Sequence, residues 1–244
     1  MSPKKTVATA SRVLRQLRHD PRTLALIMLV PVVLLTLLKY VVNGDMRTFN
    51  SVAPLVLGIF PLIVMFIVTS VATLRERTSG TLERLMTLPM GKLDLILGYA
   101  LAFAFLALLQ ALLASGVVLG LLGVTVLGGT IKVILTAVLS GILGMAMGLF
   151  VSAYAHSEFQ AVQFMPAFIF PQLLTSGFFF PREHMAKLLQ WLSDIFPMTY
   201  IIEAMQHITH ATGWSDNFLR NILITAGFSI AALILGAITL RRQE

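Results

Sequence analysis

Six apolar runs of about twenty residues constrain the fold of this chain more than any other feature of its sequence. A helix needs roughly 20 mainly apolar residues to cross the hydrocarbon core of a membrane. The only charged residue within the six runs is Lys39, near the end of the first. The sequence therefore predicts an all-α, polytopic membrane protein with six transmembrane helices, at residues 23–42, 52–74, 95–120, 133–155, 159–180 and 222–240.

The segments between these runs are too short for a separate water-soluble domain of ordinary size. Of the 244 residues, 57% are hydrophobic and only 12% are charged, whereas soluble domains carry roughly 25% charged residues. The chain is expected to divide into a cytoplasmic segment at residues 1–22 and one membrane domain at residues 23–244. The absence of cysteine from the sequence excludes disulfides and cysteine-ligated metal sites.

The first 22 residues carry six basic side chains and one acidic one, Asp20. Val13, Leu14 and Leu17 fall on one helical face, and arginines fill most of the other. This pattern is typical of an amphipathic helix lying on an anionic membrane surface, and Asp20-Pro21 is expected to end it. Two interpretations remain open: a helix that also touches a partner protein, and a basic anchor that only fixes the topology.

The distribution of basic residues predicts the orientation. With six spans, both termini share one side, and that side holds twelve of the eighteen Lys and Arg residues. By the positive-inside rule this side is the cytoplasm. The net charge of +7 is thus explained by cytoplasmic segments, and no nucleic-acid partner is expected. The twelve residues are Lys4, Lys5, Arg12, Arg15, Arg18, Arg22, Arg75, Arg77, Arg84, Lys92, Arg241 and Arg242.

Several residues predict how the spans begin, end and pack. Turns are expected at residues 43–45 and 128–129, where Gly and Asn gather. A ridge of small residues at Gly141, Gly144 and Gly148 should allow close helix approach. Pro166 and Pro171 are expected to kink the fifth span. The polar segment 181–220 is expected to form short external helices at the membrane interface, from the pattern of Met185, Leu188, Leu189, Trp191, Leu192 and Trp214.

The loop after the second span carries the clearest local motif. Ser79 or Thr81 can cap the start of a helix, and Pro89 would end it. Glu83 would stabilise the first turn of this helix, because a negative charge there interacts favourably with the helix dipole. Leu82, Leu85 and Met86 share one face of this two-turn cytoplasmic helix. Such a helix could fit a groove on a partner protein. The alternative is a loop that merely rests on the membrane surface.

Residues 75–89 resemble the signature of ABC transporter permeases of the type-2 exporter family, in which an R-E-R-x-x-G-T-L-E-x-L-x-x-x-P pattern follows the second span. The stretches 176–181 (SGFFFP) and 195–200 (IFPMTY) are similar to the family's passage from the fifth span into its external helices. The chain departs from the family pattern at Glu203, Gln206 and His207, where a basic residue is common.

The resemblance implies a permease subunit that pairs with a second permease copy and with separate ATPase subunits in a bacterial plasma membrane. ATP and Mg would bind to the ATPase subunits, since this chain has no Gly-x-x-x-x-Gly-Lys-Ser/Thr loop. The helix after the second span would be the coupling helix, with the N-terminal helix beside it. Carried over from the family, the residues that contact the ATPase would be Glu76, Gly80, Thr81, Leu82, Glu83 and Leu85, with contributions from Arg12 and Arg15.

The predicted path for cargo runs between the two permease copies. A hydrophobic gate on the outer half of the fifth span is one interpretation of the phenylalanines there, and lipid-facing or packing side chains are the other. Few large polar groups lie within the spans, among them Gln110, Gln163 and Gln172, which suits an amphiphilic cargo such as a drug, a lipid or a lipid-linked glycan. The gate residues would be Phe168, Phe170, Phe178, Phe179 and Phe180.

Three other functions compete with export. An ion-coupled secondary transporter or channel would place ionisable residues within its spans, and an intramembrane enzyme would need a polar catalytic constellation there; neither pattern is present in the sequence. A purely structural membrane protein stays open. No metal site is expected, because His207 and His210 lack a carboxylate pair at ligand-like spacing.

Overall fold

The computed structural model describes residues 2–81 and 91–239, and the regular structure within these two ranges is entirely helical. The predicted coupling-helix residues Leu82, Glu83 and Leu85 lie outside the described residues. The α-helices are α1 (Pro3–Arg18), α2 (Pro21–Val41), α3 (Met46–Thr78), α5 (Lys92–Gly116), α6 (Thr130–Ser152), α7 (Glu158–Thr175), α8 (Lys187–Ile195), α9 (Pro197–His210) and α10 (Asp216–Thr239).

Five helical segments in the described part of the chain are long and apolar enough to cross a membrane. They are Pro21–Val41, Met46–Thr78, Leu93–Leu121, Thr130–Ser152 and Asp216–Thr239, where the third includes a π-helical turn (Val117–Leu121) that continues α5. The prediction of an all-α polytopic membrane protein is confirmed. The fifth predicted run forms α7, an 18-residue helix that is not one of the five, since three glutamines make it more polar.

The helix boundaries follow the local signals of the sequence at three of the predicted breaks. Asp20 ends the N-terminal segment and caps α2, because its side chain accepts a hydrogen bond from the backbone N–H of Thr23 at 3.2 Å. Asn43 and Gly44 turn the chain between α2 and α3 with φ angles of 52° and 75°. Gly129 has a φ of 91° immediately before α6, in the left-handed region that favours glycine.

Two boundaries differ from the predictions. α3 has 33 residues, about 50 Å at 1.5 Å per residue, so its last turns extend past a hydrocarbon core of about 30 Å. Those turns carry Arg75, Glu76 and Arg77. α7 ends at Thr175 instead of residue 180, because the chain turns at Gly177 with a φ of 87°. Phe178, Phe179 and Phe180 therefore follow the helix and are not part of it.

α6 packs on α3 and α5 through the predicted glycine ridge. A Cβ atom on Gly144 would overlap the backbone of Leu62 in α3, and one on Gly148 would lie 2.5 Å from the carbonyl oxygen of Phe66. Gly141 faces α5 instead, where a Cβ atom would lie 2.9 Å from that of Ala107. The glycine spacing therefore places α6 between the other two helices at backbone contact distance.

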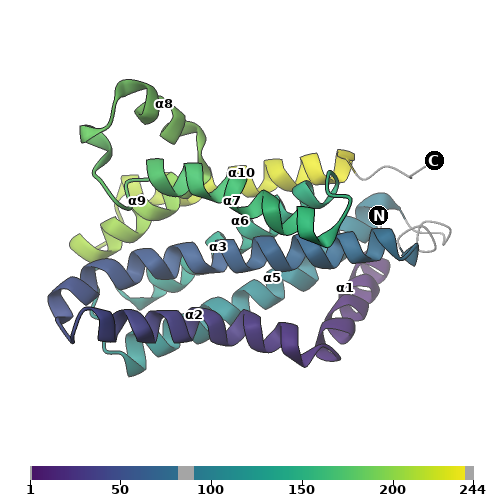
Figure 1. Ribbon diagram of the computed structural model, residues 1–244, viewed down its shortest axis with the longest axis horizontal. Helices are drawn as coiled ribbons and strands as arrows, with labels where there is room; N and C mark the ends of the chain where they lie inside the picture. Colours follow the sequence, from purple (N-terminus) through teal and green to yellow (C-terminus); the bar gives the residue numbers. More distant parts are fainter. Residues whose placement is uncertain (1, 82–90, 240–244) are drawn as a thin grey trace.

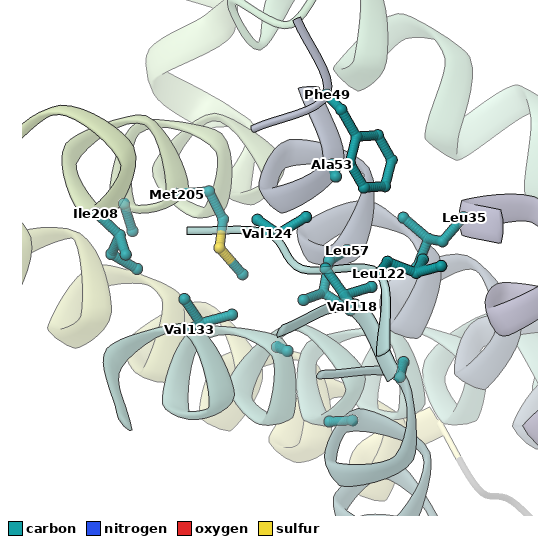
Figure 2. Close-up of a cluster of buried hydrophobic side chains, with 14 of the residues drawn as sticks. Leu35, Phe49, Ala53, Leu57, Val118, Leu122, Val124, Val133, Met205 and Ile208 are labelled. Atoms are coloured by element: carbon teal, nitrogen blue, oxygen red, sulfur yellow. The ribbon is translucent and has the colours of Figure 1, made fainter. Parts of the chain in front are cut away.

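The segment at residues 181–220 is only partly exposed, whereas the prediction placed all of it in short helices at the membrane interface. α8 is exposed, with Leu188 and Trp191 accessible to 73% and 70%. α9 is inserted into the bundle, and its Met205 and Ile208 point into the same cluster as Leu57 of α3 and Val133 of α6 (Figure 2). Apolar residues at helical spacing can face lipid or protein, and in α9 they face protein.

Side chains from distant parts of the sequence meet at two opposite ends of the bundle. One end gathers α1, the C-terminal ends of α3, α6 and α10, and the N-terminal ends of α5 and α7 (Figure 1). The other end gathers the connections near residues 42–50, 122–129 and 208–215. There the amide of Asn50 donates to Thr125 at 2.9 Å, and the N–H of Gly128 donates to the carbonyl of Ile208 at 2.8 Å.

Candidate functional site

The N-terminal helix α1 packs against the first two turns of α5. Asp94 accepts hydrogen bonds from the backbone N–H of Ser2 at 2.8 Å and from that of Gly91 at 3.2 Å. Farther along, a Cβ atom on Gly98 would lie 2.5 Å from that of Thr9. Because this close approach needs glycine at residue 98, α1 is held against α5 by both packing and a buried carboxylate.

Arg12 joins α1 to two other helices, in an arrangement that we call the Arg12 clamp (Arg12, Glu76 and Tyr99). Its guanidinium donates two parallel hydrogen bonds to the carboxylate of Glu76 in α3, at 2.9 and 3.1 Å. It also donates to the hydroxyl of Tyr99 in α5 at 2.8 Å. The side chains of Arg12 and Glu76 are 27% and 13% exposed. A bidentate pair shielded to this extent is stronger than a surface ion pair.

A second ion pair at the same end is more open to solvent. Arg75 in α3 donates to both carboxylate oxygens of Glu158 in α7, at 2.6 and 2.9 Å, and the two side chains are 57% and 51% exposed. Hydrogen bonds from the Arg75 side chain lower the pKa of Glu158 below its ordinary value. Arg77 donates to the carbonyl oxygen of Ser152 at the end of α6.

The predicted ATPase-contact residues have different surroundings in the structure. Arg12 and Glu76 bind one another, whereas Arg15 is exposed on α1 and, among the described residues, donates to the carbonyl of Ser11 in its own helix. Gly80 turns the chain just after α3 with a φ of 70°, and the hydroxyls of Ser79 and Thr81 lie 3.0 Å apart. The Arg12 clamp thus lies one turn from the start of the predicted coupling helix.

Sequence reasoning missed Tyr99 and Asp94 at this end. Both lie within the first two turns of α5; Tyr99 is inside the third predicted run, and Asp94 immediately precedes it. The signal that was available is position: polar side chains in the first turns of a span lie at the same membrane surface as the charged loop before it.

Comparison with known proteins decides the family. The family model described as ABC-2 type transporter matches residues 5–210. This chain belongs to the ABC-2 type transporter family. The family prediction is therefore confirmed, and residues 5–210 include most of α1, the Arg12 clamp, α7 and α9.

Curated relatives of this ABC-2 chain are similar over most of its length. It is 27% identical over 198 residues to the probable multidrug ABC transporter permease YbhS of Escherichia coli (strain K12), covering 81% of this chain and 52% of that protein. It is 28% identical over 189 residues to ABC transporter G family member 20 of Dictyostelium discoideum, covering 71% and 26%. For the inner membrane transport permease YhhJ of E. coli (strain K12) the identity is 26% over 204 residues, covering 82% and 54%. The chain spans about half or less of the length of these relatives.

The five phenylalanines of the predicted gate do not form one cluster within a single copy of the ABC-2 chain. The ring of Phe168 packs against Phe66 and Phe164, with centroids 6.4 Å away in each case. Phe178 and Phe179 pack edge to face at 4.8 Å. Among the described residues no ring contact joins these two groups, and Phe170 and Phe180 are exposed. The gate stays a prediction.

The residues at which the chain departs from the family pattern hold the segment between α7 and α10 together. Arg182 donates to the carboxylates of Asp194 and Glu203. Gln206 donates to the carbonyl of Gly177 at 3.1 Å. A ring nitrogen of His207 lies 2.7 Å from the hydroxyl of Ser215. Within residues 2–81 and 91–239, no group of three or more His, Asp or Glu side chains is arranged to hold a metal ion.

Proposed function

We propose that this chain is the membrane-spanning permease subunit of an ATP-driven ABC exporter, powered by separate ATPase subunits that dock at the end of the bundle that carries the Arg12 clamp. The observation that carries the proposal is the clamp itself, since it fixes α1 beside the end of α3, from which the predicted coupling helix begins. Relatives named as ABC transporter permeases support the same function.

In this proposal the ATPase contacts are Gly80, Thr81, Leu82, Glu83 and Leu85, with Arg15 on the adjacent helix. Arg12 and Glu76 have a different role, because their charges are satisfied within the chain: they position α1. ATP and Mg bind to the partner subunits. When the ATPase dimer closes, it pushes the coupling helix, and the clamp makes α1, α3 and α5 move as one body between discrete states.

The movement can reach the opposite end of the molecule through α3. This helix is in backbone contact with α6 at Gly144 and Gly148. Farther along α3, a Cβ atom on Gly58 would lie 3.0 Å from the side chain of Met205 in α9. A displacement at the clamp is therefore passed to the inserted helix α9 beside the predicted exit, because tightly packed elements shift as units.

The cargo in this proposal is an amphiphile that passes between this chain and a second permease copy, with membrane lipid around both. α7 presents an apolar surface suited to that contact, since Phe159, Phe170 and Leu174 are 73%, 56% and 62% exposed. The aromatic gate belongs to the same proposal. The relative YbhS is named as a probable multidrug permease, which agrees with a drug-like or lipid-like cargo.

The proposed topology has six spans, with α7 as the fifth, after a cytoplasmic segment at residues 1–22, in a bacterial inner membrane. Both termini are cytoplasmic in it. Of the described Lys and Arg residues, nine lie at the clamp end or on α1 and six lie at the opposite end, which supports this orientation. The six are Lys39, Arg47, Lys132, Arg182, Lys187 and Arg220.

Single cysteines can test the topology directly, because the natural chain has none. We expect Ser79→Cys and His156→Cys to resist a membrane-impermeant maleimide on intact cells and to react in inverted vesicles. Phe180→Cys and Thr212→Cys should react on intact cells. Labelling of His156→Cys and Phe180→Cys from the same side would show that α7 does not cross the membrane.

Docking at the coupling helix is tested with Leu82→Asp. We expect co-purification of the ATPase to weaken by about 30-fold, because an apolar anchor in a groove typically contributes 2 kcal/mol or more to such an interface. The matched control is Leu188→Asp, which changes an exposed leucine of α8 at the opposite end and should leave assembly unchanged. If Leu82→Asp retains the ATPase as well as the control does, the docking assignment is wrong.

A further inference from the structure

A cavity of about 470 Å³ lies between α1, α2, α3 and α5, beside the Arg12 clamp. Its walls are mainly aliphatic and aromatic, and include the fully buried Ile27 and Phe103. Leu26 also lines the cavity and is 63% exposed, so the cavity reaches the molecular surface on the side of α2 that faces lipid in the proposed topology. Its volume is within the range of small-molecule sites, roughly 300–1,000 Å³.

One end of this cavity is polar and carries an excess negative charge. Its charged lining residues are Asp20, Arg75 and Glu76. Arg75 is paired with Glu158, and Glu76 is paired with Arg12. The carboxylate of Asp20 accepts hydrogen bonds from the hydroxyl and N–H of Thr23 at 2.6 and 3.2 Å, and no cation of the described residues lies within ion-pair distance of it. Asp20 therefore has no ion-pair partner among these residues, and Arg75 attracts it only at longer range.

The surroundings of Asp20 favour its negatively charged form at neutral pH. The hydrogen bonds from the side chain and backbone of Thr23 lower the pKa of Asp20 below its ordinary value. The basic side chains of Arg15, Arg18 and Arg22 are exposed and are not part of the cavity lining. The polar end thus presents an anion to a molecule inside the cavity.

Two aromatic rings add a further preference for positive charge. Tyr99 and Phe103 both line the cavity, and their rings are stacked with centroids 6.5 Å apart. The face of an aromatic ring attracts cations; Tyr99 is already engaged by the guanidinium of Arg12, whose carbon lies 5.7 Å from the ring centroid, and Phe103 has no such cation over its ring among the described residues. Apolar walls, aromatic faces and an unpaired carboxylate together match a molecule that is both hydrophobic and positively charged.

We propose that this cavity binds a lipophilic cation from the cytoplasmic leaflet, with the apolar body between α2 and α3 and the positive charge near Asp20. Glu76 and Tyr99 belong to both the cavity wall and the Arg12 clamp. A bound cation therefore contacts the Arg12 clamp, which positions α1. Binding of the cation can in this way change the end of the bundle at which the ATPase is proposed to dock. This last step rests on the proposed export function, whereas binding itself does not.

Binding is tested on the full chain in phosphatidylcholine nanodiscs without ATPase, by equilibrium dialysis against tetraphenylphosphonium, with empty nanodiscs subtracted. We expect saturable binding that Asp20→Asn weakens at least tenfold, since asparagine keeps the capping oxygen of α2 and removes the charge. Tetraphenylborate, an anion of similar shape, should show no saturable binding. Equal binding by Asp20→Asn and the natural chain, or saturable binding of the anion, would overturn the proposal.

A pair of tryptophan variants in α2 tests the location of the site. Val30 lines the cavity, whereas Val33 is 51% exposed on the same helix. Val30→Trp should abolish binding of the cation, and Val33→Trp should leave it intact; equal affinities would place the cation elsewhere. Leu82→Asp should bind the cation normally even when it loses the ATPase, so failure of the docking proposal and failure of this one are distinguishable.

Discussion

Replacing Gly144 with alanine is expected to lower the free energy of unfolding by about 3 kcal/mol. The new Cβ atom would lie 2.7 Å from the Cα atom of Leu62 and would overlap its carbonyl group. Both atoms belong to the backbone of α3, so no side chain can rotate away and the two helices must separate. Thermal unfolding of the purified protein in detergent measures the effect, and Gly144→Val should prevent accumulation of folded protein.

Gly227→Ala is the matched control for this substitution. Gly227 also lies inside a long membrane helix, α10, but nothing is within 4 Å of a Cβ atom placed there. Alanine should leave stability unchanged or raise it by up to about 1 kcal/mol, because it is the better helix former. Similar losses for the two variants would mean that the α3–α6 contact is not as close as the structure has it.

Glu76→Gln is expected to reduce ATP-driven transport at least tenfold and to loosen α1. Glutamine keeps one acceptor oxygen and removes the charge that the partly buried guanidinium of Arg12 requires, at a cost of about 2 kcal/mol. Hydrogen–deuterium exchange of the α1 amides measures the loosening, and transport in reconstituted vesicles measures the function. Unchanged exchange in α1 would show that the clamp does not hold this helix.

Glu158→Gln provides the comparison, because it breaks a bidentate pair of the same chemistry that is about half exposed. Solvent screens such a pair, so we expect a cost below about 1 kcal/mol and little change in transport. The contrast between the two variants separates the effect of burial from the effect of losing an arginine–carboxylate pair.

Local signals predicted most of the helical framework. Asp20-Pro21, Asn43-Gly44 and Gly129 end or begin helices where the sequence indicated, since caps and positive φ angles depend on a few neighbouring residues. The glycine spacing of α6 predicted close packing, although not which glycine faces which helix. The insertion of α9 was not predictable, because its apolar face would look the same whether it contacted lipid or protein.

The candidate site shows the complementary limit of sequence reasoning. Arg12 and Glu76 were named through the family resemblance as contacts to a partner, and the structure shows them bound to one another. They are separated by 64 residues, and Tyr99 is 87 residues from Arg12. No helical periodicity relates positions so far apart, so only the packing of α1 across α3 and α5 reveals that they meet.

α2 is held less tightly along its length than α3, α5 and α6, because 17% of its apolar window is buried, against 50–61% in those helices. Asp20 caps its first turn, and at the opposite end Lys39 donates to the carbonyl of Leu122, just after the π-helical turn, at 2.9 Å. Between these ends only Ile27, Pro31 and Leu35 are buried. Proline at position 31 removes one backbone hydrogen bond at mid-helix. Between its two fixed ends α2 can therefore bend outward and widen the space behind it without leaving the bundle.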